Sequence, residues 1–114
     1  MKTSLKLLCF ATGAFAVPTI ASAATAQEIW TKDCQKCHAA DGSASGPMGQ
    51  KLKLKNYTDP AVQAAMTDDV IIKSIKDGEK DEKTGKMTMP AGAAKYSEAD
   101  VMALKDFVRS LKKG

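Results

Sequence analysis

The clearest periodicity of apolar positions lies near the end of the chain. Apolar residues recur there every three to four positions, at Val101, Leu104, Val108 and Leu111. This spacing is that of one face of an α-helix. Ser97 precedes the stripe and Asp100 follows three residues later, which is a variant of the capping box that opens a helix. The pattern predicts a last helix that starts after Ser97 and packs its apolar face inward.

Two further helices are predicted upstream. Asp59 followed by Pro60 is typical of an N-cap and a proline at the first helical position, and it opens a short helix that runs to about Met66. Thr67 is expected to cap a second helix, from Asp68 to Lys76. The residues of this second helix expected to face inward are Val70, Ile71, Ile72 and Ile75.

An earlier stripe predicts a first helix from Ala24 to His38. Its residues on one side, at spacings of three and four, are Ile29, Trp30, Cys34, Cys37 and His38. Glycine, proline and serine then indicate an irregular loop from Ala39 to Asp59. No segment has a convincing strand pattern, although Met89 must be extended because it precedes a proline. The chain is therefore predicted to be all-α, with about four helices.

The start of the chain has a pattern of a different kind. Two lysines precede an uncharged run from Leu7 to Ala21, which closes on the small-x-small sequence Ala-Ser-Ala ending at Ala23. This arrangement is typical of a secretory signal peptide, here residues 1–23, that is removed on export. The run is too short for a membrane span, so no membrane anchor is expected after cleavage. Residues 24–114 would then form the exported domain.

Composition and charge narrow the classes of function. The chain has 114 residues, of which 44% are apolar and 26% are charged, as in an ordinary soluble domain. Its formal charge of +4 falls by two when Lys2 and Lys6 are removed, so no nucleic acid partner is expected. Cys34 and Cys37 then remain. A disulfide between residues so close would restrain the unfolded chain little, which indicates another role for them.

These cysteines belong to the sequence Cys-Gln-Lys-Cys-His, the C-x-x-C-H motif of covalent haem attachment. On a helix Cys34, Cys37 and His38 share a face, so both thiols can reach the vinyl groups on one edge of a porphyrin, with the imidazole under the iron. Zinc would need about four ligands, and a thioredoxin-like pair would need a βαβ surround. We therefore predict one covalent haem c, with its iron, as the cofactor.

The second axial ligand of the iron is predicted to be a methionine. His38 is the only histidine, and methionine is the remaining ligand that favours reversible electron transfer. Met66 and Met102 lie on predicted helices and are expected to fill gaps in the core. Met89 is the first choice, because the proline after it stiffens the chain. Met87 is the second choice, because residues two apart in an extended segment point the same way.

Together these motifs resemble the monohaem class I cytochrome c family, in particular its small soluble bacterial members. The resemblance covers Ala24 to Lys113 and includes an aromatic residue four positions before C-x-x-C-H, a Gly/Pro loop and a Met-Pro pair. A terminal amphipathic helix with an aromatic residue completes it. The family implies a small all-α fold around one covalently bound haem, in which Trp30 and Phe107 mark the crossing of the first and last helices.

The resemblance also implies a role for each site residue. Cys34 and Cys37 would form the thioether links to haem, His38 the proximal bond to iron and Met89 the distal one. Pro47 resembles the loop proline whose carbonyl accepts a hydrogen bond from the ring of the ligating histidine, which would fix the orientation of that ring.

The expected function is that of an electron carrier rather than an enzyme. Its iron would cycle between Fe(II) and Fe(III) while a soluble monomer in the periplasm docks briefly with redox protein partners. Lysines expected at the docking rim are Lys36, Lys51, Lys53, Lys86 and Lys95. The alternative is a haem-based gas sensor or haem enzyme with an open or displaceable distal ligand. Such a site needs acid–base groups above the iron, and the sequence shows no obvious charged residue beside Met89.

Overall fold

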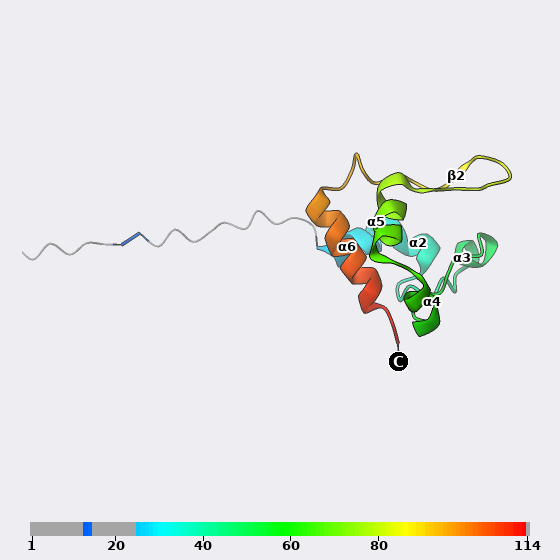
Figure 1. The fold of residues 1–114 in the computed structure, drawn as a ribbon, viewed down its shortest axis with the longest axis horizontal. Helices are drawn as coiled ribbons and strands as arrows, with labels where there is room; N and C mark the ends of the chain where they lie inside the picture. The colour runs from blue at the N-terminus through cyan, green and yellow to red at the C-terminus, as the bar shows by residue number, and fades with distance from the viewer. Residues whose placement is uncertain (1–12, 15–24, 114) are drawn as a thin grey trace, which may run out of the picture.

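The computed structural model describes residues 13–14 and 25–113, and the predicted all-α class is confirmed there (Figure 1). Helices from both ends of this part of the chain pack together to form the body of the domain. Within the described residues, no helix is long and apolar enough to cross a membrane. The signal peptide predicted at residues 1–23 lies outside the described residues except for 13–14, so it stays a prediction.

The first helix is continuous but irregular. It consists of α1 (Ala26–Ile29), a π-helical turn η1 (Trp30–Cys34) and α2 (Gln35–His38). It begins at Ala26 rather than at Ala24, because the hydroxyl of Thr25 accepts a hydrogen bond that caps its start. In the π turn the backbone N–H of Gln35 donates to the carbonyl of Trp30, five residues earlier. A regular α-helix would use the carbonyl four residues earlier.

The last helix, α6 (Glu98–Ser110), has the predicted capping box. The Ser97 hydroxyl accepts a hydrogen bond from the backbone N–H of Asp100 at 3.1 Å, and the Asp100 carboxylate accepts one from the N–H of Ser97 at 3.2 Å. Its apolar face packs on α1 and on the helix α5 (Asp68–Asp77), and the rings of Trp30 and Phe107 lie 5.3 Å apart. The crossing of the first and last helices is thus formed by this aromatic pair.

The two middle helices, α4 (Pro60–Ala65) and α5, also begin at their predicted caps. A carboxylate oxygen of Asp59 accepts from the N–H of Ala61 at 2.8 Å, and the hydroxyl of Thr67 accepts from the N–H of Val70 at 3.2 Å. Each of these bonds satisfies a backbone donor that a helix start leaves without a partner.

The side chains of Arg109 and Gln63 tie the last helix to the middle ones. The guanidinium of Arg109 donates to the carbonyl oxygens of Gln63 and Met66, both at 2.6 Å, and to the carboxylate of Asp68 at 2.9 Å. The buried side-chain amide of Gln63 in turn donates to the carbonyl of Val108 at 2.8 Å. These bonds satisfy the backbone carbonyls where α4 ends and so fix α6 against the α4–α5 corner.

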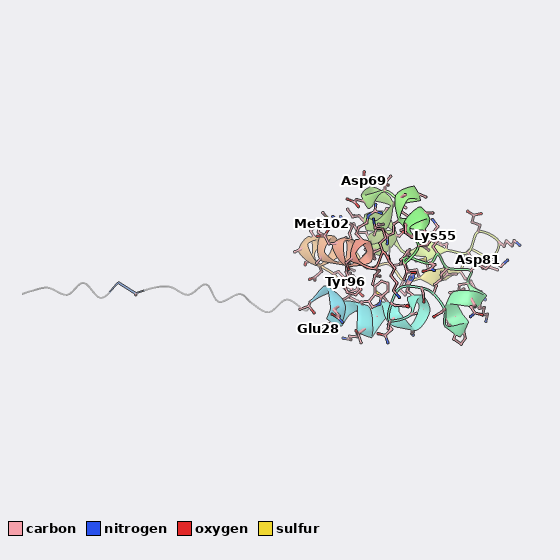
Figure 2. All side chains as sticks on the ribbon, turned by 90° about the horizontal axis from the view of Figure 1, so that it is seen from below. Glu28, Lys55, Asp69, Asp81, Tyr96 and Met102 are labelled. Carbon is pink, nitrogen blue, oxygen red and sulfur yellow. The ribbon has the colours of Figure 1, made fainter. Side chains whose placement is uncertain are left out.

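Two apolar side chains expected to face the core are exposed. Val70 is 50% exposed and Met102 is 44% exposed, the latter on the outer side of α6 (Figure 2). Each lies one position from a buried residue, Ile71 and Val101 respectively. Because one residue turns an α-helix by about 100°, the neighbour of a buried residue points away from the same contact. These two predictions were wrong, whereas Met66 is buried as expected.

The stretch predicted as an irregular loop contains a short helix, α3 (Pro47–Lys51). Pro47 at its first position suits a helix start, since that position needs no backbone donor. Backbone bonds then close the loop on itself, from Leu54 N–H to Gly49 O and from Tyr57 N–H to Gly42 O, both at 2.9 Å. These bonds fold residues 39–59 back on themselves, and a bond from Ala44 N–H to His38 O at 3.0 Å connects the loop to the end of the first helix.

A small β-hairpin lies between α5 and α6, although no strand was predicted. Strands β1 (Glu79–Lys80) and β2 (Met87–Met89) are antiparallel, with Glu79 opposite Met89. Gly78 ends α5 with a φ of +71°, which lets the chain turn directly into β1. The hairpin extends away from the helices in Figure 1. Met89 is therefore presented by a strand, extended as its following proline requires.

Candidate functional site

One cavity gathers the residues with candidate chemistry. It measures about 700 Å³ and lies between the first helix, the loop after it, α5 and the hairpin. The predicted haem residues that line it are Cys34, Cys37, His38, Met87 and Met89. A volume of roughly 300–1,000 Å³ is usual for cofactor sites. The fold thus brings the C-x-x-C-H motif and both candidate methionines to a single space.

The imidazole of His38 is held mainly by packing. The residue is only 8% exposed, and its ring stacks on Tyr57 at 5.3 Å and lies 5.6 Å from the ring of Trp30. Burial lowers the pKa of the imidazole and so favours its neutral form, which is the form that binds a metal ion. Its buried Nδ1 atom has no hydrogen-bond partner among the described residues. A buried nitrogen without a partner is unusual in a protein, and it leaves one ring nitrogen available to donate the hydrogen bond that the resemblance implies.

The hydrogen bond implied between Pro47 and His38 is not formed in this structure. Pro47 is exposed at the start of α3 and does not line the cavity. The bond that does connect this loop to His38 is a backbone one, in which the N–H of Ala44 donates to the His38 carbonyl at 3.0 Å. The role of Pro47 in orienting the ring stays a prediction.

The backbone directly after His38 is strained. Ala39 has φ 66° and ψ 164°, a region that residues other than glycine rarely occupy. The indole N–H of Trp30 donates to the Ala39 carbonyl at 3.1 Å, and the N–H of Ala39 donates to the carbonyl of Gln35 at 2.8 Å. These two bonds fix a sharp turn of the chain where it leaves the helix, directly after the candidate ligand His38.

The two cysteines of the motif are free and partly exposed. Burial raises the pKa of the Cys34 thiol to about 11, and the neighbouring Asp33 carboxylate acts in the same direction. The thiol therefore stays protonated at neutral pH, unlike the low-pKa thiols of disulfide exchange. Within the described part of the chain, no group of three or more His, Cys, Asp or Glu residues is placed to hold a metal ion. The raised pKa argues against the redox-pair interpretation.

The two candidate methionines differ in depth. Met89 is partly buried and packs against the hydrophobic core, whereas Met87 is 45% exposed. The approach of α5 to the strand is so close that a Cβ atom on Gly78 would press on the carbonyl oxygen of Met89 and lie 2.7 Å from the terminal methyl of Met87. The end of α5 thus fixes the position of strand β2, which carries both methionines.

Among the polar side chains that line the cavity, Asp33, Glu79 and Tyr96 were not predicted from the sequence. The hydroxyl of Tyr96 donates to the carboxylate of Asp33 at 2.6 Å, although the two residues are 63 positions apart. Glu79 lies opposite Met89 in the hairpin, so the expectation of no charged residue beside Met89 was wrong. Nothing in the sequence signals these contacts, because each depends on segments that only the fold brings together.

Lysines are more numerous than carboxylates around the cavity. Those that line it are Lys32, Lys36, Lys53, Lys55 and Lys95, against Asp33 and Glu79. Three of the five lysines predicted at a docking rim are among them, while Lys51 and Lys86 are not. The surroundings of the cavity therefore carry an excess of positive charge.

The residues present fit the predicted haem c. Two thiols, one neutral imidazole and the thioethers of four methionines line one largely apolar cavity, and these are the donor types that attach haem and bind its iron. The methionines are Met48, Met66, Met87 and Met89.

Comparison with known proteins agrees with this geometry. A family model described as cytochrome c matches residues 23–112. Among solved structures, the KustC0563 c-type cytochrome is similar to 78% of this chain and 99% of its own, with 27% sequence identity and a TM-score of 0.67. No curated protein matches the sequence. By the extent of the family match the chain belongs to the cytochrome c family, whose domains bind covalent haem c with its iron and serve in electron transfer.

Proposed function

We propose that this chain is an exported single-haem electron carrier, in which Cys34 and Cys37 attach the haem and His38 and Met89 bind its iron. The observation that carries the proposal is that all four side chains line one cavity of about 700 Å³. When bound, haem c supplies an iron that changes charge by one unit, at a potential that a methionine ligand raises. The protein's own task is to hold both ligands in place and keep water away from them.

The packing supports His38 as the fixed ligand and Met89 as the second one. Trp30 and Tyr57 confine the imidazole from two directions, so its ring has little freedom to turn. Met89 packs against the core while Met87 is half exposed, and a partly buried thioether is better shielded from competing water. This difference in depth favours Met89 over Met87.

The excess of lysines around the cavity supports brief docking with acidic redox partners. Charged groups at a rim speed up encounter more than they strengthen the complex, as suits a carrier that must bind and leave quickly. We expect a monomer that meets its partners by such contacts. The expected sign is a rate of electron exchange that falls as ionic strength rises, because salt screens exposed charges beyond about 10 Å at 0.1 M.

The export signal supports a location in the periplasm without a membrane anchor. The two N-terminal lysines, the uncharged run from Leu7 to Ala21 and the Ala-Ser-Ala ending at Ala23 together favour cleavage before Ala24. The intact mass of the protein purified from the periplasm should equal that of residues 24–114 plus one haem. A mass that includes residues 1–23 would contradict the export proposal.

The ligand assignment is tested by absorption spectra of the purified holoprotein with and without carbon monoxide. We expect a low-spin ferrous spectrum that carbon monoxide leaves unchanged and a weak far-red ferric band typical of methionine bound to iron. Met89→Ala should abolish this band and open the iron to carbon monoxide, whereas Met87→Ala, the matched control, should change neither. The reverse result would assign the ligand to Met87.

One observation favours the second candidate function, that of a gas sensor or haem enzyme. The carboxylate of Glu79 lines the cavity beside Met89 and accepts a hydrogen bond from Ser74 at 2.5 Å. A carboxylate near the iron could take part in acid–base chemistry if the methionine left. A wild-type protein that binds carbon monoxide readily would favour this function over electron transfer.

A further inference from the structure

The segment between Met89 and α6 is tied to the first helix by two side chains that meet at one carboxylate oxygen. The hydroxyl of Tyr96 donates to Oδ2 of Asp33 at 2.6 Å, and the ammonium of Lys95 lies 3.0 Å from the same oxygen. Asp33 directly precedes Cys34 in the first helix. Figure 2 shows Tyr96 beside that helix. The contact thus joins the chain that follows one candidate ligand to the helix that carries the other.

The other end of this segment is tied to α5. The N–H of Gly92 donates to the carbonyl of Ile75 at 2.8 Å, and the N–H of Ala93 donates to that of Lys76 at 3.0 Å. A Cβ atom on Gly92 would lie 2.6 Å from the ring of Tyr96, so the ring lies directly over the glycine. The backbone between these two attachments, residues 92–96, has little freedom to move, because the N–H of Tyr96 also donates to the Gly92 carbonyl at 2.8 Å.

The Asp33–Tyr96 bond is of a strong kind. A hydrogen bond to an ionised carboxylate is roughly twice as strong as a neutral one. The side chain of Asp33 is only 19% exposed, so solvent competes weakly for this oxygen. The bond to Tyr96, followed by that to Lys95, lowers the pKa of Asp33, while burial and the carboxylate raise the pKa of Tyr96. Both changes keep the proton on the phenol at neutral pH, so Tyr96 is the donor.

We propose that Tyr96 and Asp33 are positioning residues for Met89, holding the strand end that carries this methionine against the helix that carries Cys34 and His38. The inference rests on the proposed function, in which Met89 binds the iron. Tyr96 touches neither candidate ligand of the iron by any hydrogen bond in the structure, so it acts through the segment of residues 90–96. Loss of the bond would let this segment move away from the first helix and make dissociation of Met89 easier.

The test compares holoprotein variants in which the bond is removed but the packing is kept. Tyr96→Phe retains the ring over Gly92 and deletes only the donor. We expect carbon monoxide to bind the ferrous variant roughly tenfold faster than wild type. Loss of a charge-assisted hydrogen bond should raise the population of the state in which Met89 has left the iron by about this factor. The far-red ferric band should also disappear at a lower temperature. Asp33→Asn should act similarly, and the double variant should add little to either.

A core variant separates positioning from general loss of stability. Val101 is 1% exposed and lies outside the lining of the cavity, so Val101→Ala should lower stability without loosening the segment. Its rate of carbon monoxide binding should equal that of wild type. The inference fails if Tyr96→Phe leaves the rate and the band unchanged, or if Val101→Ala changes them as much. A wild-type spectrum without the band, or a band that survives in Met89→Ala, would instead refute the proposed ligand and this inference with it.

Discussion

Replacing Gly78 by alanine tests whether the end of α5 sets the position of Met89. Gly78 has φ 71° and ψ −171°, a conformation that is essentially restricted to glycine. An added Cβ would press on the Met89 carbonyl oxygen and lie 2.8 Å from the amide nitrogen of Ala91. Both are backbone atoms and cannot rotate away as a flexible side chain would. The strand that carries Met89 must therefore shift as a unit.

The size of the effect follows from the backbone conformation. A non-glycine residue in this region costs about 1–3 kcal/mol, offset by roughly 0.4–1 kcal/mol from the lower entropy of the unfolded alanine chain. A net loss of about 1–2 kcal/mol lowers the melting temperature of a domain of this size by roughly 5–15 °C. The forced shift of β2 adds to this loss.

The assay is thermal unfolding of the holoprotein by circular dichroism, with the far-red ferric band recorded in parallel. Gly85→Ala is the matched control, because Gly85 also has a positive φ of +70° but nothing lies within 4 Å of its Cβ position. The control should lose at most about 1 kcal/mol and keep the band. Gly78→Ala should lose more stability and weaken the band. Equal losses in the two variants, with both bands intact, would show that the close approach to Met89 has no effect on the ligand.

Two further predictions concern strain and charge elsewhere in the fold. Ala39→Gly should stabilise the protein by about 1 kcal/mol in chemical unfolding, because it relieves a backbone conformation that alanine disfavours, and a destabilised variant would contradict the strain argument. The hydrogen bond from Arg109 lowers the pKa of Asp68, so its stabilising contribution is complete above the ordinary pKa of 3.8 and is lost as pH falls through the lowered value. Asp68→Asn should therefore show a smaller loss of melting temperature on acidification than wild type, and identical acid profiles would refute this.

The helix starts could be predicted because their signals are local. Asp59, Thr67 and Ser97 each cap the helix that follows within three residues, so the sequence alone contains the whole interaction. The inward faces were less predictable. Val70 and Met102 are apolar and adjacent to core residues, but helix rotation turns them outward. An apolar residue on a helix therefore indicates a face only together with its partners three and four positions away.

The hairpin and the helix α3 show a different limit. Strand β1 has two residues, and its pairing with β2 depends on a bulge and on where α5 ends. Such short elements have no periodicity of their own. Pro47 begins a short helix within a stretch whose composition indicates only a loop.

The residues of the candidate site differ in the same way. Those that are close in sequence could be predicted, and those that the fold brings together could not. Cys34, Cys37 and His38 are neighbours in sequence, so their common face on the cavity could be expected from helix geometry. The preference for Met89 over Met87 stays a prediction, with their difference in burial as support. The contact between Asp33 and Tyr96 joins segments far apart in the chain, and no local pattern predicts it.

The π turn in the first helix separates a segment that packs in the core from a segment that lines the cavity. Before the turn, Ile29 belongs to the core beside α6, and after it Cys37 and His38 line the cavity. If the same residues formed a regular α-helix without the π turn, every side chain after Cys34 would be rotated by about 100° relative to those before Trp30. The extra residue therefore lets the direction of the attachment motif be set independently of the helix crossing.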